Sequence, residues 1–286
     1  MKRILLIAVL LGTMITATTY FVCIAAPSVL FGKGIKGSGN IVTRTIDAPD
    51  FDRVDAARAV KVVITGKATD KITIQADDNI MEYVVVEAKG GRLTATIDKS
   101  VNNVSNADVT VTVPANGRIR ALDASSAARI TSDVTLTADK FSIDASSAAR
   151  IDAAVKSTTC AVAASSASDI DAAIETGTCT VEASSASDID AAIETGTCTV
   201  EASSASKITL KGSAAECSID MSSASKLSAA EFTVTDCSVD TSSAAKATVN
   251  CTGTLRAAAS SGSSIRYTGD CKTSISKSSG GSVSRK

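Results

Sequence analysis

Short runs of alternating apolar and polar residues fill most of the chain after residue 40. Examples are Lys71–Gln75, which ends near Asp77, and Asp108–Val113, which ends at Pro114. A period of two is typical of β-strands, because successive side chains point to opposite faces, and Gly, Asp, Asn and Pro mark the turns between them. No segment after the first 26 residues shows a long helical period. The pattern therefore predicts an all-β protein.

From Arg118 onward these runs form an explicit repeat. A Ser-Ser pair begins at residues 125, 146, 165, 184, 203, 222, 242, 260 and 278, which gives repeats of 18 to 21 residues. Two consecutive copies, Ser165–Ala183 and Ser184–Ala202, are identical. A repeat of this length that is rich in β-branched residues is typical of a solenoid, in which each rung contacts only its neighbours.

Alignment of the copies on the Ser-Ser pair gives columns of uniform character. Positions three residues before and five residues after the pair are apolar in nearly every copy, and the positions two before and four after it are polar in nearly every copy. Identical side chains that recur once per repeat indicate parallel strands about 4.8 Å apart. We therefore predict a single-stranded parallel β-helix over residues 37–286, right-handed because parallel crossovers almost always are. The Ser-Ser-Ala motif is expected at a corner, where serine hydroxyls satisfy the turn backbone.

The N-terminus carries a targeting signal. Lys2 and Arg3 precede an apolar run that reaches Ala26, as in a secretory signal. The run is also long enough to remain as a membrane anchor, and lipidation at Cys23 is a third alternative. All three place the rest of the chain across the inner membrane. We expect an exported protein of the cell envelope, in the periplasm, the outer membrane or at the cell surface, that contacts membrane only through this segment.

Three parts of the chain are expected. Residues 1–26 form the signal peptide or membrane anchor, residues 27–36 form a glycine-rich linker, and residues 37–286 form the β-helix domain. Glycines 34, 37 and 39 do not make a phosphate-binding loop, because neither a preceding strand nor the required Lys-Ser/Thr pair is present.

The composition excludes several kinds of functional site. The net charge is −1, from 29 basic and 30 acidic residues, so no basic field favours nucleic acid. The chain has no histidine, which removes Ser-His and Cys-His nucleophile pairs and the commonest transition-metal ligand. Aromatic residues make up 3% of the chain, so the core must consist of Ala, Val, Ile, Leu and Cys. We expect no catalytic residue, no cofactor and no metal.

Five cysteines occupy one inward column, five residues before the Ser-Ser pair. Stacked neighbours in parallel strands have parallel Cβ vectors at about the strand spacing, which is long for a disulfide. We therefore expect a buried thiol ladder that fills the core, with one or two strained bridges or a soft-metal site as alternatives. Cys251 and Cys271 fall outside the column and are expected to pack independently. The ladder comprises Cys160, Cys179, Cys198, Cys217 and Cys237.

An acidic band lies in the two identical rungs, at Asp169, Asp171, Asp188 and Asp190. Like charges stacked on neighbouring strands repel. Basic residues above and below in the same column would relieve that repulsion, and a weak divalent-ion site is the alternative. Paired acids also occur in β-helix enzymes that cleave polysaccharides, but nearly uniform rungs leave little room for a cleft or inserted loops.

Several motifs resemble one known family. They are Gly37–Val42, Phe51–Val54, Val60–Ile64, Ala76–Asn79, Leu122–Ala127 and Leu136–Phe141. Together they resemble the head GIN domain family, described as "putative autotransporter adhesin" and common in Bacteroides-like bacteria. The resemblance covers nearly all of residues 37–286 and implies a right-handed β-helix in the cell envelope. The chain ends at Ser278–Lys286, where an autotransporter would need a membrane barrel, so self-transport is not expected.

Three functions remain as hypotheses. The first is a non-catalytic envelope β-helix, an adhesin or binding module whose Ser/Thr-rich surface holds a carbohydrate or another envelope protein. The second is a structural scaffold that self-associates through open sheet ends. The third and least favoured is an enzyme that degrades polysaccharide.

Overall fold

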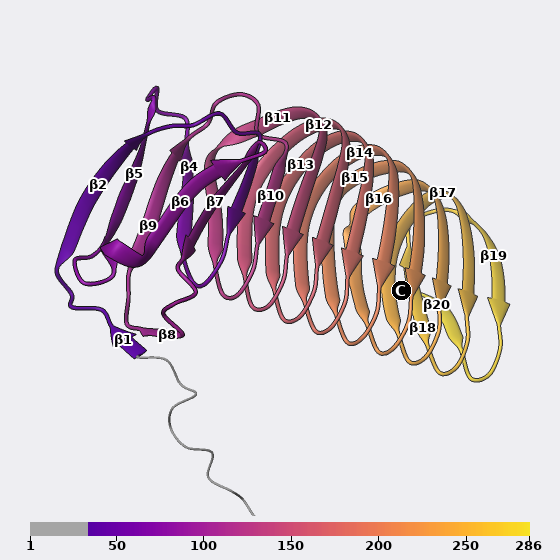
Figure 1. Ribbon diagram of the computed structural model, residues 1–286. Coiled ribbons are helices and arrows are strands. Elements are labelled where there is room, and N and C mark those ends of the chain that lie inside the picture. The colour runs from indigo at the N-terminus through magenta and orange to yellow at the C-terminus, as the bar shows by residue number, and fades with distance from the viewer. Residues whose placement is uncertain (1–33) are drawn as a thin grey trace, which may run out of the picture.

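The computed structural model describes residues 34–286 and forms a β-solenoid (Figure 1). The expected signal or anchor segment 1–26, including Cys23, lies outside the described residues. The described part is all-β apart from one 3-10 turn, η2 (Met81–Tyr83), and contains no helix long and apolar enough to cross a membrane. Successive coils stack along one axis from an N-terminal cap toward the C-terminus. The all-β solenoid prediction is confirmed.

The strands fall into an N-terminal and a C-terminal set. The first set is β1 (Gly34–Lys36), β2 (Ile41–Asp47), β3 (Arg53–Ala56), β4 (Lys61–Thr65), β5 (Lys71–Asp77), β6 (Val84–Lys89), β7 (Arg92–Ile97), β8 (Asn103–Ser105) and β9 (Val109–Pro114). The second set is β10 (Ala121–Ala124), β11 (Arg129–Ala145), β12 (Arg150–Ala164), β13 (Asp169–Ala183), β14 (Asp188–Ala202), β15 (Lys207–Met221), β16 (Lys226–Thr241), β17 (Lys246–Ala259), β18 (Ser264–Thr268), β19 (Lys272–Lys277) and β20 (Ser282–Arg285).

Every strand pair in the C-terminal set is parallel, with equivalent repeat positions in register. Ile170 pairs with Ile151 on one side and Ile189 on the other, and all three side chains are buried. Burial of a β-branched side chain stabilises the fold by about 1.5–3 kcal/mol. Because each apolar column repeats once per rung, the core is one continuous stack of Ile, Val, Ala, Leu and Cys side chains along the solenoid.

The N-terminal third departs from the predicted parallel β-helix. There β2 pairs antiparallel with β5, β5 with β9, and β6 with β7. The β6–β7 reversal uses Gly90 and Gly91, whose φ angles are 60° and 79°. Two left-handed residues in a two-residue loop favour an antiparallel hairpin. The expectation of uniform parallel rungs from residue 37 is therefore wrong for this region, which forms a mixed cap.

The end of the expected linker is also part of the fold. Gly34–Lys36 forms β1, which pairs in parallel with β8. The buried carboxylate of Asp77 fastens the next segment, because it accepts hydrogen bonds from the backbone N–H groups of Gly39 (2.7 Å) and Asp108 (2.9 Å). These backbone hydrogen bonds, led by that from Asp108, lower the pKa of Asp77.

Each solenoid turn passes through the Ser-Ser corner in a left-handed conformation. In the central rung Ser185 and Ala186 have φ angles of 53° and 60°, and the N–H of Ser187 donates to the carbonyl of Ser184 (3.2 Å). Positive φ at both central positions is the mark of a type I′ turn. The backbone at these two positions is left-handed, a conformation in which a Cβ costs about 1–2 kcal/mol. This cost explains why the motif uses small residues at the corner.

The serine that satisfies the corner backbone is the third one of the motif. Ser187 is buried, and its hydroxyl donates to the carbonyl of Ala164 in the preceding rung (2.9 Å). Ser185, by contrast, is exposed. The predicted corner is confirmed. The backbone hydrogen bonding expected of the Ser-Ser pair, however, is made by the third serine, Ser187. Equivalent buried serines are Ser168, Ser206, Ser225 and Ser263.

Candidate functional site

One long side of the solenoid carries three parallel rows of outward-facing side chains, and we call this side the row face. It is formed by the last segment of each long strand, just before the Ser-Ser corner. Strand register aligns each row across the rungs. The middle or hydroxyl row is Arg92, Arg53, Ala121, Ser142, Ala161, Thr180, Thr199, Ser218, Ser238 and Arg256.

Two further rows flank the hydroxyl row. The threonine row is Lys140, Thr159, Thr178, Thr197, Glu216, Asp236 and Thr254. The acidic row is Asp55, Asp123, Asp144, Ala163, Glu182, Glu201, Asp220 and Asp240. A groove of about 480 Å³ runs between the acidic row and the corner serines. A second, also of about 480 Å³, lies over the hydroxyl and threonine rows near Cys217.

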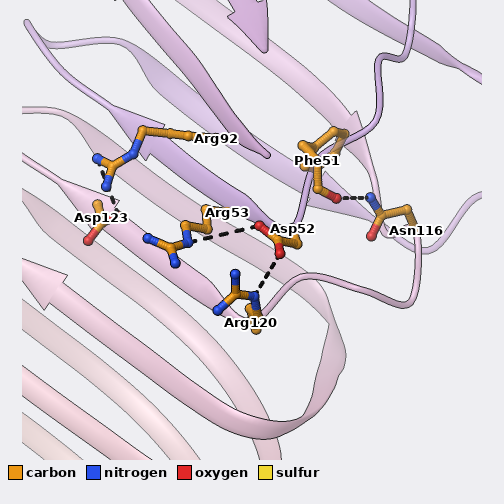
Figure 2. Close-up of polar contacts among 7 residues, drawn as sticks. All are labelled: Phe51, Asp52, Arg53, Arg92, Asn116, Arg120 and Asp123. Atoms are coloured by element: carbon orange, nitrogen blue, oxygen red, sulfur yellow. Dashed lines mark hydrogen bonds and ion pairs between the residues drawn. The ribbon is translucent and has the colours of Figure 1, made fainter. Parts of the chain in front are cut away.

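The N-terminal end of the row face carries an arginine cluster, Arg53, Arg92 and Arg120 (Figure 2). Arg53 on β3 lies directly between Arg92 on β7 and Ala121 on β10. Arg120 immediately precedes β10. Asn116 fixes the segment that carries Arg53, because its side-chain amide donates to the carbonyl of Phe51 (2.7 Å). Phe51 itself is buried and anchors this segment in the core.

Carboxylates hold the arginines in place. Asp52 accepts a hydrogen bond from Nε of Arg120 (2.7 Å), and its other oxygen lies 3.9 Å from Nε of Arg53. Nη1 of Arg92 lies 3.2 Å from Asp55 and 3.8 Å from Asp123. Asp52 therefore holds Arg120 by its Nε edge and lies beside the Nε edge of Arg53, and its buried Oδ1 has no hydrogen-bond partner among the described residues. Figure 2 shows both guanidinium ends directed away from Asp52.

The acidic row is poorly neutralised beyond this cluster. Burial raises the pKa of Asp123, and the charge of Arg92 opposes that rise. Burial likewise raises the pKa of Asp144. In residues 34–286 the ion pairs of this row involve only Asp55 and Asp123. The row face is thus positive at its N-terminal end and negative along one flank.

The predicted acidic band lies on a different side of the solenoid, at the start of β13 and β14. Asp169 is in register with Asp188, and Asp171 with Asp190. Arg150 forms an ion pair and hydrogen bonds with Asp169, and Nζ of Lys207 lies 3.9 Å from Asp188. The Asp169–Asp188 pair therefore has a cation above and below it, whereas Asp171 and Asp190 stand between Asp152 and Thr209. Among the described residues, no group of three or more His, Cys, Asp or Glu side chains is arranged to hold a metal ion.

The thiol-ladder cysteines occupy one buried, in-register column. Cys160, Cys179, Cys198, Cys217 and Cys237 are free thiols that follow Phe141 and precede Leu255 in the stack. Hydrogen bonds with neighbouring thiols, together with burial, raise the pKa of Cys179 and of Cys217. Burial raises the pKa of Cys251 to about 11. Buried structural thiols are chemically inert, and the burial of all five gives this column a packing role.

Sequence reasoning missed the arginine cluster. Phe51–Val54 served only as a family motif, and Arg92 and Arg120 lie 39 and 67 residues beyond Arg53 in the sequence. The three meet because β3 pairs with both β7 and β10. The acidic row was visible as a polar column, but the sequence does not show that it flanks a cavity.

Comparisons with known proteins agree on the fold. The family model described as "Putative auto-transporter adhesin, head GIN domain" matches residues 50–192 and 170–271. A "putative adhesin" from Parabacteroides merdae is 18% identical with a TM-score of 0.69, over 88% of this chain and 99% of that one. A "putative lipid binding protein" from Parabacteroides distasonis is 17% identical with a TM-score of 0.66, over 89% and 100%.

A second Parabacteroides distasonis protein, a "putative adhesin", is 19% identical with a TM-score of 0.67, over 89% of this chain and all of that one. A comparison with curated proteins finds no match. At these identities the structural likeness establishes the solenoid fold.

Proposed function

This chain belongs to the family described as "Putative auto-transporter adhesin, head GIN domain", and we propose that it is a non-catalytic binding module of the cell envelope whose row face recognises carbohydrate. Export is part of the proposal. It is supported by the basic residues Lys2 and Arg3 and by the apolar run that follows them. The adhesin descriptions of the family and of its structural relatives point in the same direction.

The hydroxyl and threonine rows carry this proposal. Thr178 and Thr180 on β13 stand in register with Thr197 and Thr199 on β14, so pairs of hydroxyls recur at the strand spacing of about 4.8 Å. Each hydroxyl both donates and accepts hydrogen bonds. A polymer whose own hydroxyls recur along its length matches such a surface, and polysaccharides have that property.

The arrangement of carboxylates favours binding over cleavage. Glycoside hydrolysis needs two carboxyl groups on opposite sides of the scissile bond. On the row face Glu182, Glu201 and Asp220 form one file, and Glu216 and Asp236 of the threonine row form a second. The two files stand four residues apart along the strands, about 13 Å at 3.3 Å per residue, which exceeds the roughly 5–9.5 Å between the paired carboxyl groups of glycosidases. The acidic band also consists of two in-register files, Asp169 with Asp188 and Asp171 with Asp190, and forms ion pairs at Asp169 and Asp188.

A lipid ligand is less consistent with this surface. An acyl chain needs an apolar groove or patch. Among residues 34–286 the exposed large hydrophobic side chains are Ile41 (48% exposed) and Ile275 (42% exposed). They lie on β2 and β19, at opposite ends of the solenoid. The grooves of the row face are lined mainly by Ser, Thr and charged side chains.

A glycan screen tests the proposal. The full chain, purified in mild detergent, would be applied to an array of neutral and acidic oligosaccharides. Surface protease treatment and fractionation of whole cells would establish its location. We expect glycan binding and an envelope location. Absence of binding to every glycan, or a cytosolic location, would contradict the proposal.

Paired variants locate the binding surface. Thr180→Val with Thr199→Val removes two hydroxyls from the row face and keeps shape and strand propensity. Thr209→Val with Thr248→Val is the matched control on another side of the solenoid, on β15 and β17. We expect the first pair to weaken glycan binding about tenfold, the effect of losing roughly 1.4 kcal/mol of hydrogen bonding. The control pair should bind like the wild-type chain.

A further inference from the structure

The arginine cluster borders a cavity of about 560 Å³ at the N-terminal end of the row face. Its walls include Arg53, Arg92, Arg120 and Lys140, together with the hydroxyls of Thr178 and Thr180. The hollow exists because three small residues follow the arginines in the hydroxyl row. Ala121 and Ala161 leave the space between the arginines and the first threonines open.

The strand register places like charges side by side. Arg53 and Arg92 are direct partners on adjacent parallel strands, an arrangement that is unfavourable in isolation. Carboxylates compensate for it only in part. The cavity region holds four cationic groups, including Lys140, against Asp52, Asp55 and Asp123. The positive charge that these carboxylates do not neutralise lies at the N-terminal end of the row face.

The contacts leave hydrogen-bond donors free. Asp52 engages Nε of Arg120 and approaches Nε of Arg53. Within residues 34–286 the Nη groups of these two arginines form no hydrogen bond to a carboxylate, and Asp52 is the sole ion-pair partner of both arginines. Their side chains are 40% and 47% exposed, so the donors are accessible to a ligand. Arginine forks bind planar oxyanions through paired, charge-assisted hydrogen bonds.

The flanking acidic row limits the ligands that fit. Asp144, Glu182 and Glu201 border the same face one row away, and a densely charged polyanion lying along the rungs would meet them. A ligand with one acid group and otherwise neutral hydroxyls avoids that repulsion. Its acid group would lie at the arginines, and its hydroxyls would lie over Thr178 and Thr180.

We infer that Arg53, Arg92, Arg120 and Lys140 form an anion subsite that takes the acid group of an acidic sugar unit within a glycan held on the row face. This inference rests on the proposed carbohydrate function and specifies its ligand class. Recognition combines charge-assisted hydrogen bonds from the arginine forks with hydroxyl contacts from the first rungs. The site binds the ligand without any covalent step.

The test compares matched probes on the full chain in mild detergent. A galactan oligosaccharide that ends in a single galacturonic acid unit, the mono-acidic probe, supplies the acid group. A neutral galactan oligosaccharide of equal length lacks it, and inorganic sulfate and glycerol phosphate supply an anion without a glycan. Calorimetric titration would measure each dissociation constant. We expect the mono-acidic probe to bind about tenfold or more tightly than the neutral oligosaccharide, and the preference to weaken as salt is raised.

Two variants assign the preference to the cavity. Arg53→Gln with Arg120→Gln removes the two forks, and Arg266→Gln, on another side of the solenoid, is the matched control. Ala161→Glu leaves the arginines intact and places a carboxylate in the cavity, with Ala192→Glu on β14 as its control. Thermal melting of each variant verifies folding. We expect the double variant and Ala161→Glu to lose the preference for acid, and both controls to keep it.

The outcomes separate the two proposals. Equal binding of acidic and neutral oligosaccharides would overturn the anion subsite and leave the carbohydrate proposal standing. Absence of any glycan binding would overturn both. Sulfate or glycerol phosphate binding as tightly as the mono-acidic probe would also overturn the subsite, because the cavity would then hold only a free anion or a lipid headgroup.

Discussion

The backbone N–H of Ala186 donates a hydrogen bond to the carbonyl of Ser204 in the next rung (3.0 Å), although Ala186 has a φ angle of 60°. The same bond joins neighbouring corners along the solenoid, from Ala59 to Ser126 at one end and from Gly262 to Ser279 at the other. A ladder of inter-rung hydrogen bonds thus holds each corner in a conformation that alanine disfavours. Each corner is therefore locally strained, and hydrogen bonds between rungs hold it in place.

Replacement of Ala186 by glycine should stabilise the protein. Glycine adopts positive φ without a Cβ penalty, and the ladder bond uses only the backbone. We expect the free energy of unfolding to rise by about 1 kcal/mol. The matched control is Ala191→Gly, a buried position on β14, which should lower stability by about 0.5–1 kcal/mol. Urea unfolding measures both, and destabilisation by Ala186→Gly would contradict the left-handed corner.

Replacement of Ser187 by alanine should destabilise the same corner. The buried hydroxyl donates to the carbonyl of Ala164, and loss of a buried hydrogen bond costs about 1 kcal/mol. The cost stays modest because the N–H of Ser184 also donates to that carbonyl (3.0 Å). Ser185→Ala, at the exposed position two residues earlier, should leave the urea midpoint unchanged. Equal effects of the two substitutions would show that the third serine has no special role.

The described cysteines should react in two classes. Cys271 is partly exposed, whereas the thiol ladder and Cys251 are buried. We expect a Cys23→Ser chain to show one thiol that reacts readily with an aromatic disulfide reagent under native conditions. The remaining thiols should react only in denaturant, because the fold buries them. Several fast native thiols, or a disulfide within the ladder, would contradict the packing role.

Stability should fall in acid because of Asp77. Hydrogen bonds from Asp108 and Gly39 lower its pKa in the folded state below the ordinary value of 3.8. Its contribution is therefore fully present above that value and is lost as pH falls through the lowered folded-state pKa. Asp77→Asn should be less stable at pH 7 and should show a weaker acid-induced loss than the wild-type chain. Denaturant unfolding of both chains across this pH range measures the difference, and equal acid-induced losses would contradict this role of Asp77.

The solenoid could be predicted because each rung repeats the same columns. The column of Ile151, Ile170 and Ile189 and the thiol ladder follow from spacing alone, and the structure places both columns in the core. The N-terminal cap was less predictable, since its alternation fits parallel and antiparallel strands equally. Only Gly90-Gly91, between two β-rich runs, carried a hairpin signal.

The corner and the arginine cluster illustrate what a linear pattern leaves out. Ser187 differs from Ser184 and Ser185 only by its place in a turn whose φ angles the sequence does not state. Arg53 and Arg92 meet because β3 accepts β7 as a parallel neighbour while β7 also pairs antiparallel with β6. Such a branched pairing depends on the fold of the whole cap, not on local spacing.

Carboxyl footprinting tests the location of the binding surface most directly. Strand β13 carries Asp171 on the acidic band and Glu182 on the row face, so one peptide reports on both sides of the solenoid. The full chain would be labelled with a carbodiimide and an amine, with and without a saturating neutral galactan oligosaccharide, which has no carboxylate of its own, and modification would be quantified residue by residue. We predict that the glycan lowers labelling of Glu182 and Glu201 and leaves Asp171 and Asp190 unchanged. Protection of Asp171 and Asp190, with Glu182 and Glu201 still labelled, would contradict the row face as the binding surface.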